Sequence, residues 1–186
     1  MSRAIQIRIS ESVVRTIHVE DGVSSPLEML PVLPADRMGE LLAVELEARG
    51  FTRDGGTMRR TDPDGIEITV DLAAATVTVR IAQGAEVSET ATLGGQVAEE
   101  KVEQGLQRLR DRAKKSVENQ VAARAEQLQR EVTTRLERKL GDIAAELDAA
   151  IGKTTVAALT ERAGQLGQIE ELVSDDAGNV TIRVKL

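Results

Sequence analysis

The residues Gly152-Lys153-Thr154-Thr155 are the part of the chain whose types most suggest chemistry, because they resemble the end of a phosphate-binding loop. Such a loop needs another glycine five residues before Gly152, and that position is Leu147. It also needs a preceding strand that aims backbone N–H groups at the phosphates, whereas a helical pattern precedes Gly152. We therefore interpret Gly152 as a helix stop and Thr154 or Thr155 as the cap of a short helix.

His18 is the only histidine of the chain. It lies in a predicted strand of alternating residues, which favours a position on the surface or at a sheet edge. A catalytic base needs a nucleophile or a second acid beside it, and the sequence offers no specific partner for His18. The sequence therefore predicts no catalytic residue.

Asp62, Asp64 and Gly65 resemble the start of a calcium loop. Ala73 stands where such a loop has its bidentate glutamate, and Pro63 fits the loop poorly. A hairpin turn is the better interpretation, and we interpret Asp175-Asp176 in the same way. We expect no metal-ligating and no cofactor-binding residue.

One basic cluster stands out, and it comprises Arg108, Arg110, Arg112, Lys114 and Lys115. Successive helix positions lie 100° apart, so the cluster wraps around a helix instead of forming one stripe. Phe51 is the only aromatic residue, so the cluster has no side chains that stack on bases. The net charge of −7 also opposes binding to nucleic acid. We expect a solvated helix surface, with an acidic protein partner as the alternative, and no nucleic-acid partner.

The composition bears on the compartment. Cysteine is absent, which excludes disulfides and thiolate metal sites, so the protein needs no oxidising compartment. The first nine residues alternate like a strand and lack the apolar core of a signal peptide. No apolar run approaches the ~20 residues that a membrane span needs. We expect a cytoplasmic protein without a membrane span.

Residues 1–82 are predicted to form an α+β domain, in which a small antiparallel sheet carries one packed helix. The helix begins at Asp36 and ends at Gly50. Period-two alternation and turn residues predict five strands, at 3–9, 13–19, 58–61, 66–70 and 76–81. Asp21-Gly22 ends the second of these strands, and residues 83–95 are predicted to be a linker.

Residues 96–151 are predicted to be a long, coiled-coil-like helical segment. It contains no proline, and its apolar residues recur with a mean step of about 3.8, near the eleven-residue repeat of a straight or slightly right-handed pair. The stripe comprises Val102, Leu106, Leu109, Ala113, Val117, Val121, Ala125, Leu128, Val132, Leu136, Leu140, Ile143, Leu147 and Ile151. The alternative is two or three shorter helices, with turns near residues 116–119 or Gly141. Residues 152–186 are predicted to form a short helix at 156–165 and a C-terminal β-hairpin.

The predicted long helix has consequences for assembly. Its apolar stripe must be covered by this chain or by another chain. None of the other predicted elements is long enough to cover an unbroken helix of ~50 residues, or ~75 Å. We therefore expect a homodimer or a hetero-complex through residues 97–151.

Three segments carry a resemblance to a known group of proteins: SRAIQIRISESVVRTIHVEDG, LEMLPVLPADRMGELLAVELEARGF and GQIEELVSDDAGNVTIRVKL. They resemble uncharacterised bacterial accessory proteins of ternary systems, which are encoded with FtsH-type or MoxR-type AAA+ ATPases and von Willebrand A domain proteins. No catalytic motif accompanies the resemblance. It implies an accessory role beside a chaperone-like AAA+ ATPase, with that ATPase or a von Willebrand A domain protein as partner.

These observations predict a non-enzymatic adaptor or assembly protein that acts through protein–protein contacts. A structural component or chaperone of a large bacterial assembly is the alternative. A small nucleotide-binding enzyme is disfavoured by the single histidine, the lack of cysteine and the incomplete phosphate loop.

Overall fold

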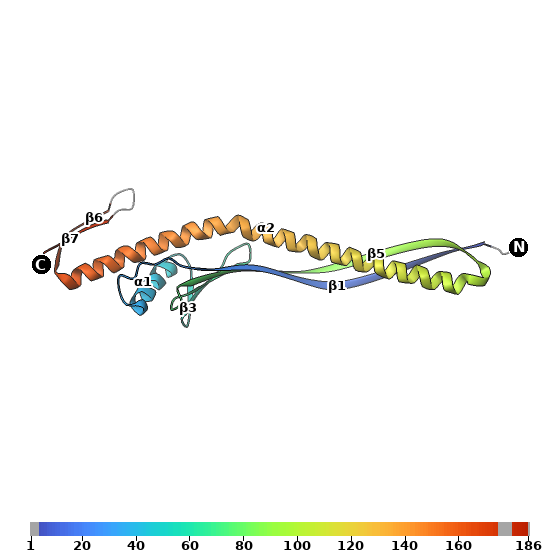
Figure 1. Ribbon diagram of the computed structural model, residues 1–186, viewed down its shortest axis with the longest axis horizontal. Helices are drawn as coiled ribbons and strands as arrows, with labels where there is room; N and C mark the ends of the chain where they lie inside the picture. The colour runs from blue at the N-terminus through green and yellow to red at the C-terminus, as the bar shows by residue number, and fades with distance from the viewer. Residues whose placement is uncertain (1–3, 175–179, 186) are drawn as a thin grey trace. The chain divides into compact units, whose positions relative to one another are not determined.

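A computed structural model describes residues 4–174 and 180–185 of the 186-residue chain (Figure 1). The strands are β1 (Ala4–Pro26), β2 (Thr52–Asp54), β3 (Thr57–Thr61), β4 (Ile66–Asp71), β5 (Thr76–Ala98), β6 (Gln168–Ser174) and β7 (Val180–Lys185). The helices are α1 (Ala35–Glu47), the short 3₁₀ helix η1 (Glu99–Lys101) and α2 (Val102–Leu166). This arrangement confirms the predicted α+β fold with a long helix and a C-terminal hairpin.

The strands form two sheets, one with the order β1-β5-β4-β3-β2 and one consisting of β6 and β7. The chain divides into two units by its internal contacts. Unit 1 comprises Met1–Asp21 and Ala82–Thr134, and unit 2 comprises Gly22–Ile81 and Arg135–Leu186. Residues of β1, β5 and α2 therefore contribute to both units.

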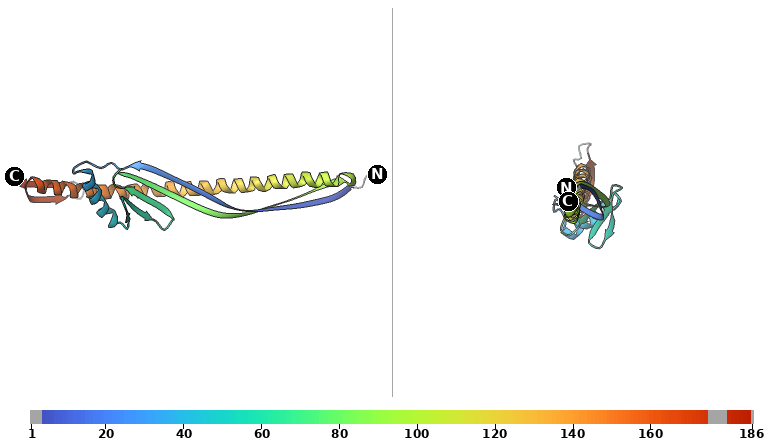
Figure 2. Two further views of the ribbon diagram at one scale, coloured as in Figure 1. Left: turned by 90° about the horizontal axis from the view of Figure 1, so that it is seen from below. Right: turned by 90° about the vertical axis from the view of Figure 1, so that its right-hand side faces the viewer.

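In unit 1, β1 and β5 form a two-stranded ribbon, and α2 lies alongside it (Figures 1 and 2). Alternating residues of the strands face the helix, as the period of two requires. The buried cluster between them comprises Val87 and Ala91 of β5 and Ala113, Val117 and Val121 of α2. Small side chains predominate in this cluster, so the core of unit 1 is a single thin layer.

Pairs of hydroxyl side chains show the register of the ribbon. Ser10 Oγ lies 3.1 Å from Thr92 Oγ1, and Ser12 Oγ lies 2.8 Å from Thr90 Oγ1. In each pair the residue numbers add to 102, so the strands run antiparallel without an insertion between the pairs. These residues lie on the face of the ribbon that is exposed to solvent.

In unit 2, strands β2 to β5 pair antiparallel, and their apolar residues face α1 and α2. Fully or almost fully buried are Met58, Ile66, Ile68, Val70, Val79 and Ile81 of the sheet. Leu42 and Leu46 of α1 are also fully buried. Ala158 of α2 packs with Leu33 and Met38 in a further buried cluster. The strands and the amphipathic helix that the sequence predicts in this region are thus confirmed.

The predicted turn between β3 and β4 is also confirmed. The Asp62 carboxylate accepts the backbone N–H groups of Asp64 and Ile66, both at 2.9 Å. Gly65 has a φ of 79°, which a residue with a side chain rarely adopts. Local side-chain hydrogen bonding therefore explains why this sequence turns here. The predicted turn at Asp175-Asp176 lies outside the described residues.

Three sequence-based predictions about strands are wrong. The two strands predicted at 3–9 and 13–19 are one continuous strand, β1. Residues 83–95, predicted to be a linker, lie within β5. Small polar residues and glycines obscure the alternation there, although Val87 and Ala91 are buried. The strand predicted to end at Asp21-Gly22 continues to Pro26. A Cβ at residue 22 would lie 2.9 Å from the Val79 carbonyl oxygen, so Gly22 allows close pairing instead of a turn.

The predicted long helix is confirmed, but the predicted stop at Gly152 is wrong. Helix α2 is one unbroken helix of 65 residues and ends at Leu166. Thr154 does not cap a new helix, because its hydroxyl donates to the Ala150 carbonyl at 2.9 Å and its side chain is fully buried. Packing of Thr154 and Ala158 thus offsets the helix-breaking tendency of glycine, which is only about 1 kcal/mol.

The expectation that no other element is long enough to cover the helical stripe is also wrong. β1 and β5 contain 23 residues each, and a strand of that length extends ~75 Å at ~3.3 Å per residue. In unit 1 these strands cover the buried residues of α2. The apolar stripe therefore does not by itself require a second chain.

Candidate functional site

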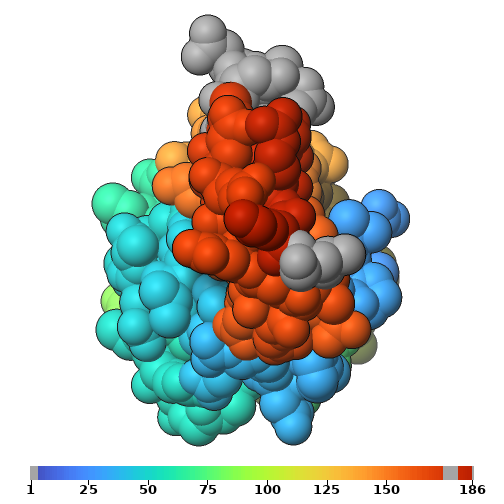
Figure 3. Space-filling view, turned by 90° about the vertical axis from the view of Figure 1, so that its left-hand side faces the viewer, coloured from blue at the N-terminus to red at the C-terminus, as the bar shows by residue number. Residues whose placement is uncertain are grey.

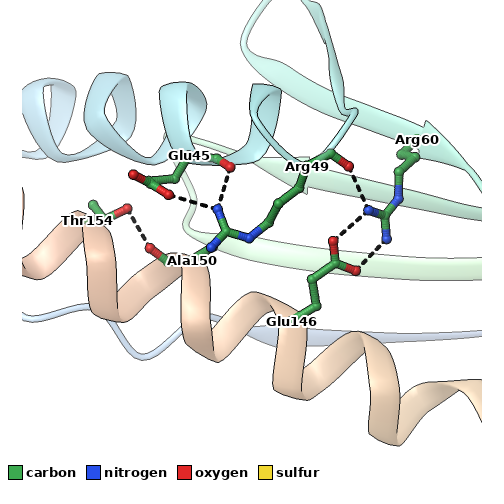
Figure 4. Close-up of polar contacts among 6 residues, drawn as sticks. All are labelled: Glu45, Arg49, Arg60, Glu146, Ala150 and Thr154. Carbon is green, nitrogen blue, oxygen red and sulfur yellow. Dashed lines mark hydrogen bonds and ion pairs between the residues drawn. The ribbon is translucent and has the colours of Figure 1, made fainter. Parts of the chain in front are cut away.

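A network of charged side chains in unit 2 joins α1, β3 and α2 (Figure 4). Arg60 Nη1 and Nη2 each donate to one carboxylate oxygen of Glu146, at 2.6 Å. Arg60 Nη1 also donates to the Arg49 carbonyl oxygen at 2.9 Å. Arg49 Nη1 in turn donates to the Glu45 carboxylate at 2.8 Å and to the Glu45 carbonyl oxygen at 2.6 Å. The network therefore holds α2 against the sheet and the end of α1.

The paired groups influence each other's ionisation. The hydrogen bonds from Arg60 lower the pKa of Glu146, against the opposite effect of burial. The hydrogen bonds to Glu146 raise the pKa of Arg60. The Arg60 guanidinium carbon also lies 4.5 Å from the centroid of the Phe51 ring, within the range of a cation–π interaction. Both groups are therefore charged at neutral pH and bind each other.

An open hollow of about 350 Å³ adjoins this network. Among the residues that line it are Arg60, Asp62, Ile68, Lys139, Ile143 and Glu146. Lys139 Nζ lies 2.9 Å from Asp64 Oδ2. The two cations of the lining are thus each paired with a carboxylate. The two ion pairs attach α2 to the sheet. Because each cation is already paired with a carboxylate, neither is available to bind an anionic ligand.

Arg60 and Glu146 were not singled out by sequence reasoning. The sequence does indicate where the Arg60 side chain points. Arg60 lies two positions after Met58 in a predicted strand, so both side chains face the same side of the sheet. Glu146 lies between Ile143 and Leu147, on the border of the helical stripe. Each pattern indicates an inward charge, but neither identifies the partner of that charge.

The residues that did suggest phosphate chemistry lie inside a helix. Gly152 and Lys153 are exposed, and the backbone before and after them is helical. Thr155 Oγ1 donates to the Ile151 carbonyl oxygen at 2.9 Å. A phosphate-binding loop presents unbonded N–H groups to its ligand, whereas a helix interior uses them for its own hydrogen bonds. The structure therefore contains no such loop at these residues.

His18 is exposed on the outer face of β1, as predicted. A Cβ at residue 84 would lie 3.1 Å from His18 Nδ1, so the imidazole packs directly over Gly84 of the neighbouring strand. Within the described residues, no group of three or more His, Cys, Asp or Glu side chains is arranged to hold a metal ion. The geometry around His18 is that of a cross-strand packing contact.

The basic cluster on α2 is exposed throughout, in agreement with the predicted solvated surface. The exposed residues are Arg108, Arg110, Arg112, Lys114 and Lys115. Arg110 Nε lies 3.4 Å from Glu11 Oε1 of β1. Arg110 is exposed and Glu11 is half-buried, and the pair is expected to contribute little to stability because solvent screens it.

The C-terminal hairpin of unit 2 presents apolar side chains to solvent. Figure 3 shows this last part of the chain, in orange and red, at the surface. Leu172 and Val173 of β6 are 47% and 48% exposed, and Leu166 at the end of α2 is 60% exposed. β6 and β7 pair only with each other among the described strands. In its described residues, the hairpin therefore has neither a third strand nor a buried side chain.

Gly167 joins α2 to the hairpin and lies close to the backbone of β7. The Gly167 N–H donates to the Ala163 carbonyl oxygen at 3.2 Å, which ends α2. A Cβ at residue 167 would clash with the Lys185 carbonyl oxygen. Glycine is thus required where β7 passes the end of the helix.

The fold and its surfaces define an α+β protein in which a long helix packs on antiparallel strands and a two-stranded hairpin with exposed apolar residues ends the described chain. Among the described helices, none is both long and apolar enough to cross a membrane.

The chain belongs to the FtsH ternary system domain X5 family, whose model matches residues 1–186. The family description associates the protein with FtsH-type ternary systems, in agreement with the resemblance in the sequence, and implies partner proteins. MoxR-type ATPases and von Willebrand A domain proteins stay predictions. No curated protein and no solved structure matches the chain.

Proposed function

We propose that this chain is a non-enzymatic adaptor that acts through protein–protein contacts within an FtsH ternary system. The observation that carries the proposal is the C-terminal hairpin, with Leu172 and Val173 about half exposed. A two-stranded hairpin alone is marginally stable in water. Burial of either side chain against a partner would supply part of the missing stabilisation, since burial of an apolar side chain contributes about 1.5–3 kcal/mol.

The hairpin also carries charges that suit a polar rim around an apolar contact. Arg183 Nη1 of β7 lies 3.0 Å from Glu171 Oε2 of β6, and both side chains are exposed. Interfaces between proteins typically combine a buried apolar centre with a charged border. The hairpin therefore has the chemistry of a protein contact site, and the FtsH-type AAA+ ATPase of the same system is its proposed partner.

The test measures binding of the full chain to that purified ATPase by calorimetry. The double variant Leu172→Lys/Val173→Lys is expected to weaken binding at least tenfold. The matched control is Leu30→Lys/Val44→Lys, in which two other exposed apolar residues of unit 2 are changed. The control should bind like the wild type. Equal losses in both double variants, or no binding of the wild type, would contradict the proposal.

The non-enzymatic part of the proposal is tested with ATP. Because Gly152 and Lys153 lie inside α2, we expect no binding of micromolar ATP to the chain. The measurement is a calorimetric titration of the wild type and of Lys153→Ala. Micromolar affinity that disappears in the variant would establish nucleotide binding at this position.

A further inference from the structure

Part of β5 has a neighbouring strand on one side only. Its neighbours in the sheet are β1 and β4, and β4 pairs with residues 76–81 of β5. Among the described strands, residues 82–98 therefore have β1 on one side and no strand on the other, and we call this side the free edge of β5. Unpaired N–H and C=O groups along an edge are a template for a further strand. The free edge of β5 is thus a candidate binding surface of unit 1.

Backbone hydrogen bonding shows which residues face the free edge. The Leu27 N–H donates to the Ala75 carbonyl oxygen at 2.7 Å, just beyond the ends of β1 and β5. The hydroxyl oxygens of Ser12 and Thr90 lie 2.8 Å apart, and the residue numbers add to 102 in both pairs. Antiparallel pairs alternate between hydrogen-bonded and non-hydrogen-bonded. Odd-numbered residues of β5 therefore bond to β1, whereas Thr90 and Thr92 direct their N–H and C=O groups to the free edge.

The polar contacts between α2 and the ribbon of unit 1 lie on the side of β1. Arg110 Nε lies 3.4 Å from Glu11 Oε1. Gln129 Nε2 donates to the Glu20 carbonyl oxygen at 3.2 Å. Within the described part of the chain, no side chain of α2 forms a hydrogen bond or an ion pair with residues 82–98 of β5. Of the two edges of the ribbon, the free edge of β5 is therefore the more open one.

Two arginines of α2 lie on the flank beside β5. Successive helix residues are 100° apart, so Arg108 and Arg112 share one flank and each lies about 160° from Arg110. Leu109, between the two flanks, is buried, and a Cβ at residue 95 of β5 would lie 3.7 Å from it. Because Arg110 approaches β1, Arg108 and Arg112 lie on the β5 side. Both are exposed, and neither has an ion-pair partner among the described residues.

The spacing of the two arginines matches the repeat of a strand. Arg108 and Arg112 are four helix residues apart, which is about 6 Å along the helix axis at ~1.5 Å per residue. Side chains two residues apart on a strand share a face and are about 6.6 Å apart at ~3.3 Å per residue. Alternate carboxylates of a strand beside β5 would therefore reach both arginines.

We propose that the free edge of β5 binds an extended acidic segment of a partner protein as an added strand. The N–H and C=O groups of Thr90 and Thr92 would supply the backbone hydrogen bonds, and alternate carboxylates of the segment would pair with Arg108 and Arg112. Addition of a strand to a sheet edge is a common mode of peptide recognition, in which the side chains give specificity. Hydrogen bonds between arginine and carboxylate are stronger than those between neutral groups.

The charges of β5 itself limit where the segment can be acidic. Glu86 and Glu89 lie on the part of β5 nearer to unit 2, and like charges across strands oppose pairing. The acidic residues of the segment are therefore expected opposite residues 90–96, where the two arginines lie. The inference is independent of the proposed function, because these residues belong to unit 1 and the C-terminal hairpin belongs to unit 2.

The test measures binding of a fluorescent peptide of four Glu-Thr repeats to the full chain by fluorescence anisotropy. The alternation places all carboxylates of the peptide on one face of a strand. A peptide of four Lys-Thr repeats is the control of opposite charge. We expect micromolar affinity for the Glu-Thr peptide and at least tenfold weaker binding of the Lys-Thr peptide. Equal affinities, or no binding of the Glu-Thr peptide at 100 µM chain, would overturn the proposal.

A charge reversal on each flank of α2 tests the position of the peptide. Arg108→Glu/Arg112→Glu should weaken binding of the Glu-Thr peptide at least tenfold. Arg110→Glu/Lys114→Glu is the matched control, because it makes the same change of net charge at the same spacing on the β1 flank. The control should weaken binding less than threefold. Equal losses in both double variants would reduce the effect to net charge and would contradict the proposed site.

Proline substitutions test which edge carries the added strand. Thr90→Pro should weaken peptide binding at least tenfold, because proline removes an N–H group from the free edge of β5. Ser12→Pro is the matched control, since it removes an N–H group from the edge of β1 and breaks the same hydroxyl pair. Loss of binding in Ser12→Pro alone would assign the peptide to β1 and overturn the proposal. Tighter binding of single-stranded DNA that also depends on Arg108 and Arg112 would assign the arginines to nucleic acid and would overturn it as well.

Discussion

Unit 1 and unit 2 each bury one part of helix α2, and they do so with different sets of side chains. Most of the largest fully buried side chains belong to unit 2, namely Leu42, Leu46, Met58, Ile66, Ile68, Ile81, Val70 and Thr154. Among the described residues, unit 1 contributes Val117 and Val132 to this group. A two-stranded ribbon offers one row of inward side chains per strand, whereas unit 2 adds further strands and α1. The stripe on α2 is continuous in sequence, but the thickness of the core depends on what lies opposite.

The closest ion pair that α2 forms is also shorter and less exposed in unit 2 than in unit 1. In unit 2, Arg60 and Glu146 form a bidentate pair that is less than one third exposed. In unit 1, Arg110 and Glu11 approach to 3.4 Å, and Arg110 is 58% exposed. Partly buried bidentate pairs are worth more than exposed ones. We therefore expect unit 2 to be the more stable unit, and the four predictions below test this comparison.

The largest expected effect comes from a charge in the core of unit 2. Ile68→Asp should unfold this unit, because Ile68 is 1% exposed and an unpaired buried carboxylate is very costly. The measurement is thermal unfolding followed by circular dichroism. Thr69→Asp, on the opposite face of β4, is the control and should cost less than about 1 kcal/mol. Equal stability of the two variants would contradict the assignment of the faces.

The second prediction compares truncations in the two cores. Leu46→Ala in unit 2 should cost about 2–5 kcal/mol, because it deletes a fully buried side chain. Val117→Ala in unit 1 removes two methyl groups and should cost about 1–2 kcal/mol. Hydrogen exchange should show that each loss is greatest in the unit that carries the change. An equal loss of protection in both units would show that they unfold together.

The third prediction concerns Glu146→Gln, which should cost about 1–2 kcal/mol through loss of a charged hydrogen-bonded pair. The pKa of Glu146 is lowered in the folded state by the hydrogen bonds from Arg60. Its stabilising contribution is therefore complete above the unfolded pKa of about 4.3 and is lost as the pH falls through the folded pKa. Urea unfolding should show a weaker dependence on pH below about 5 in the variant. An unchanged dependence would mean that the pair does not stabilise the fold.

The smallest expected effect is a gain. Gly152→Ala should raise stability by about 0.5–1 kcal/mol, because alanine is the better helix former. A Cβ at residue 152 meets no atom within 4 Å, so the site has room for it. The measurement is the midpoint of thermal unfolding, with Gly141→Ala, also in open space on α2, as a second case. Destabilisation by Gly152→Ala would favour a helix end at this residue.

Much of unit 2 could be predicted from sequence because its signals are local. Ile66, Ile68 and Val70 alternate cleanly, and the Asp62 turn uses its own side chain to bond the backbone. The candidate site was less predictable. The pairing of Arg60 with Glu146 joins residues 86 positions apart, and neither local pattern identifies the other residue.

The sequence by itself predicted the long helix, with shorter helices as the alternative, because an apolar stripe with a step near 3.8 residues is a property of one segment. It also determined the turn between β3 and β4 and the absence of cysteine chemistry. Only the tertiary structure decided that residues 83–95 are strand and that α2 continues past Gly152. The reason is that both depend on distant partners: Val87 and Ala91 extend along β5 because Ala113 and Val117 lie opposite them. Gly152 stays helical because Thr154 and Ala158, the residues that follow it, are buried in unit 2.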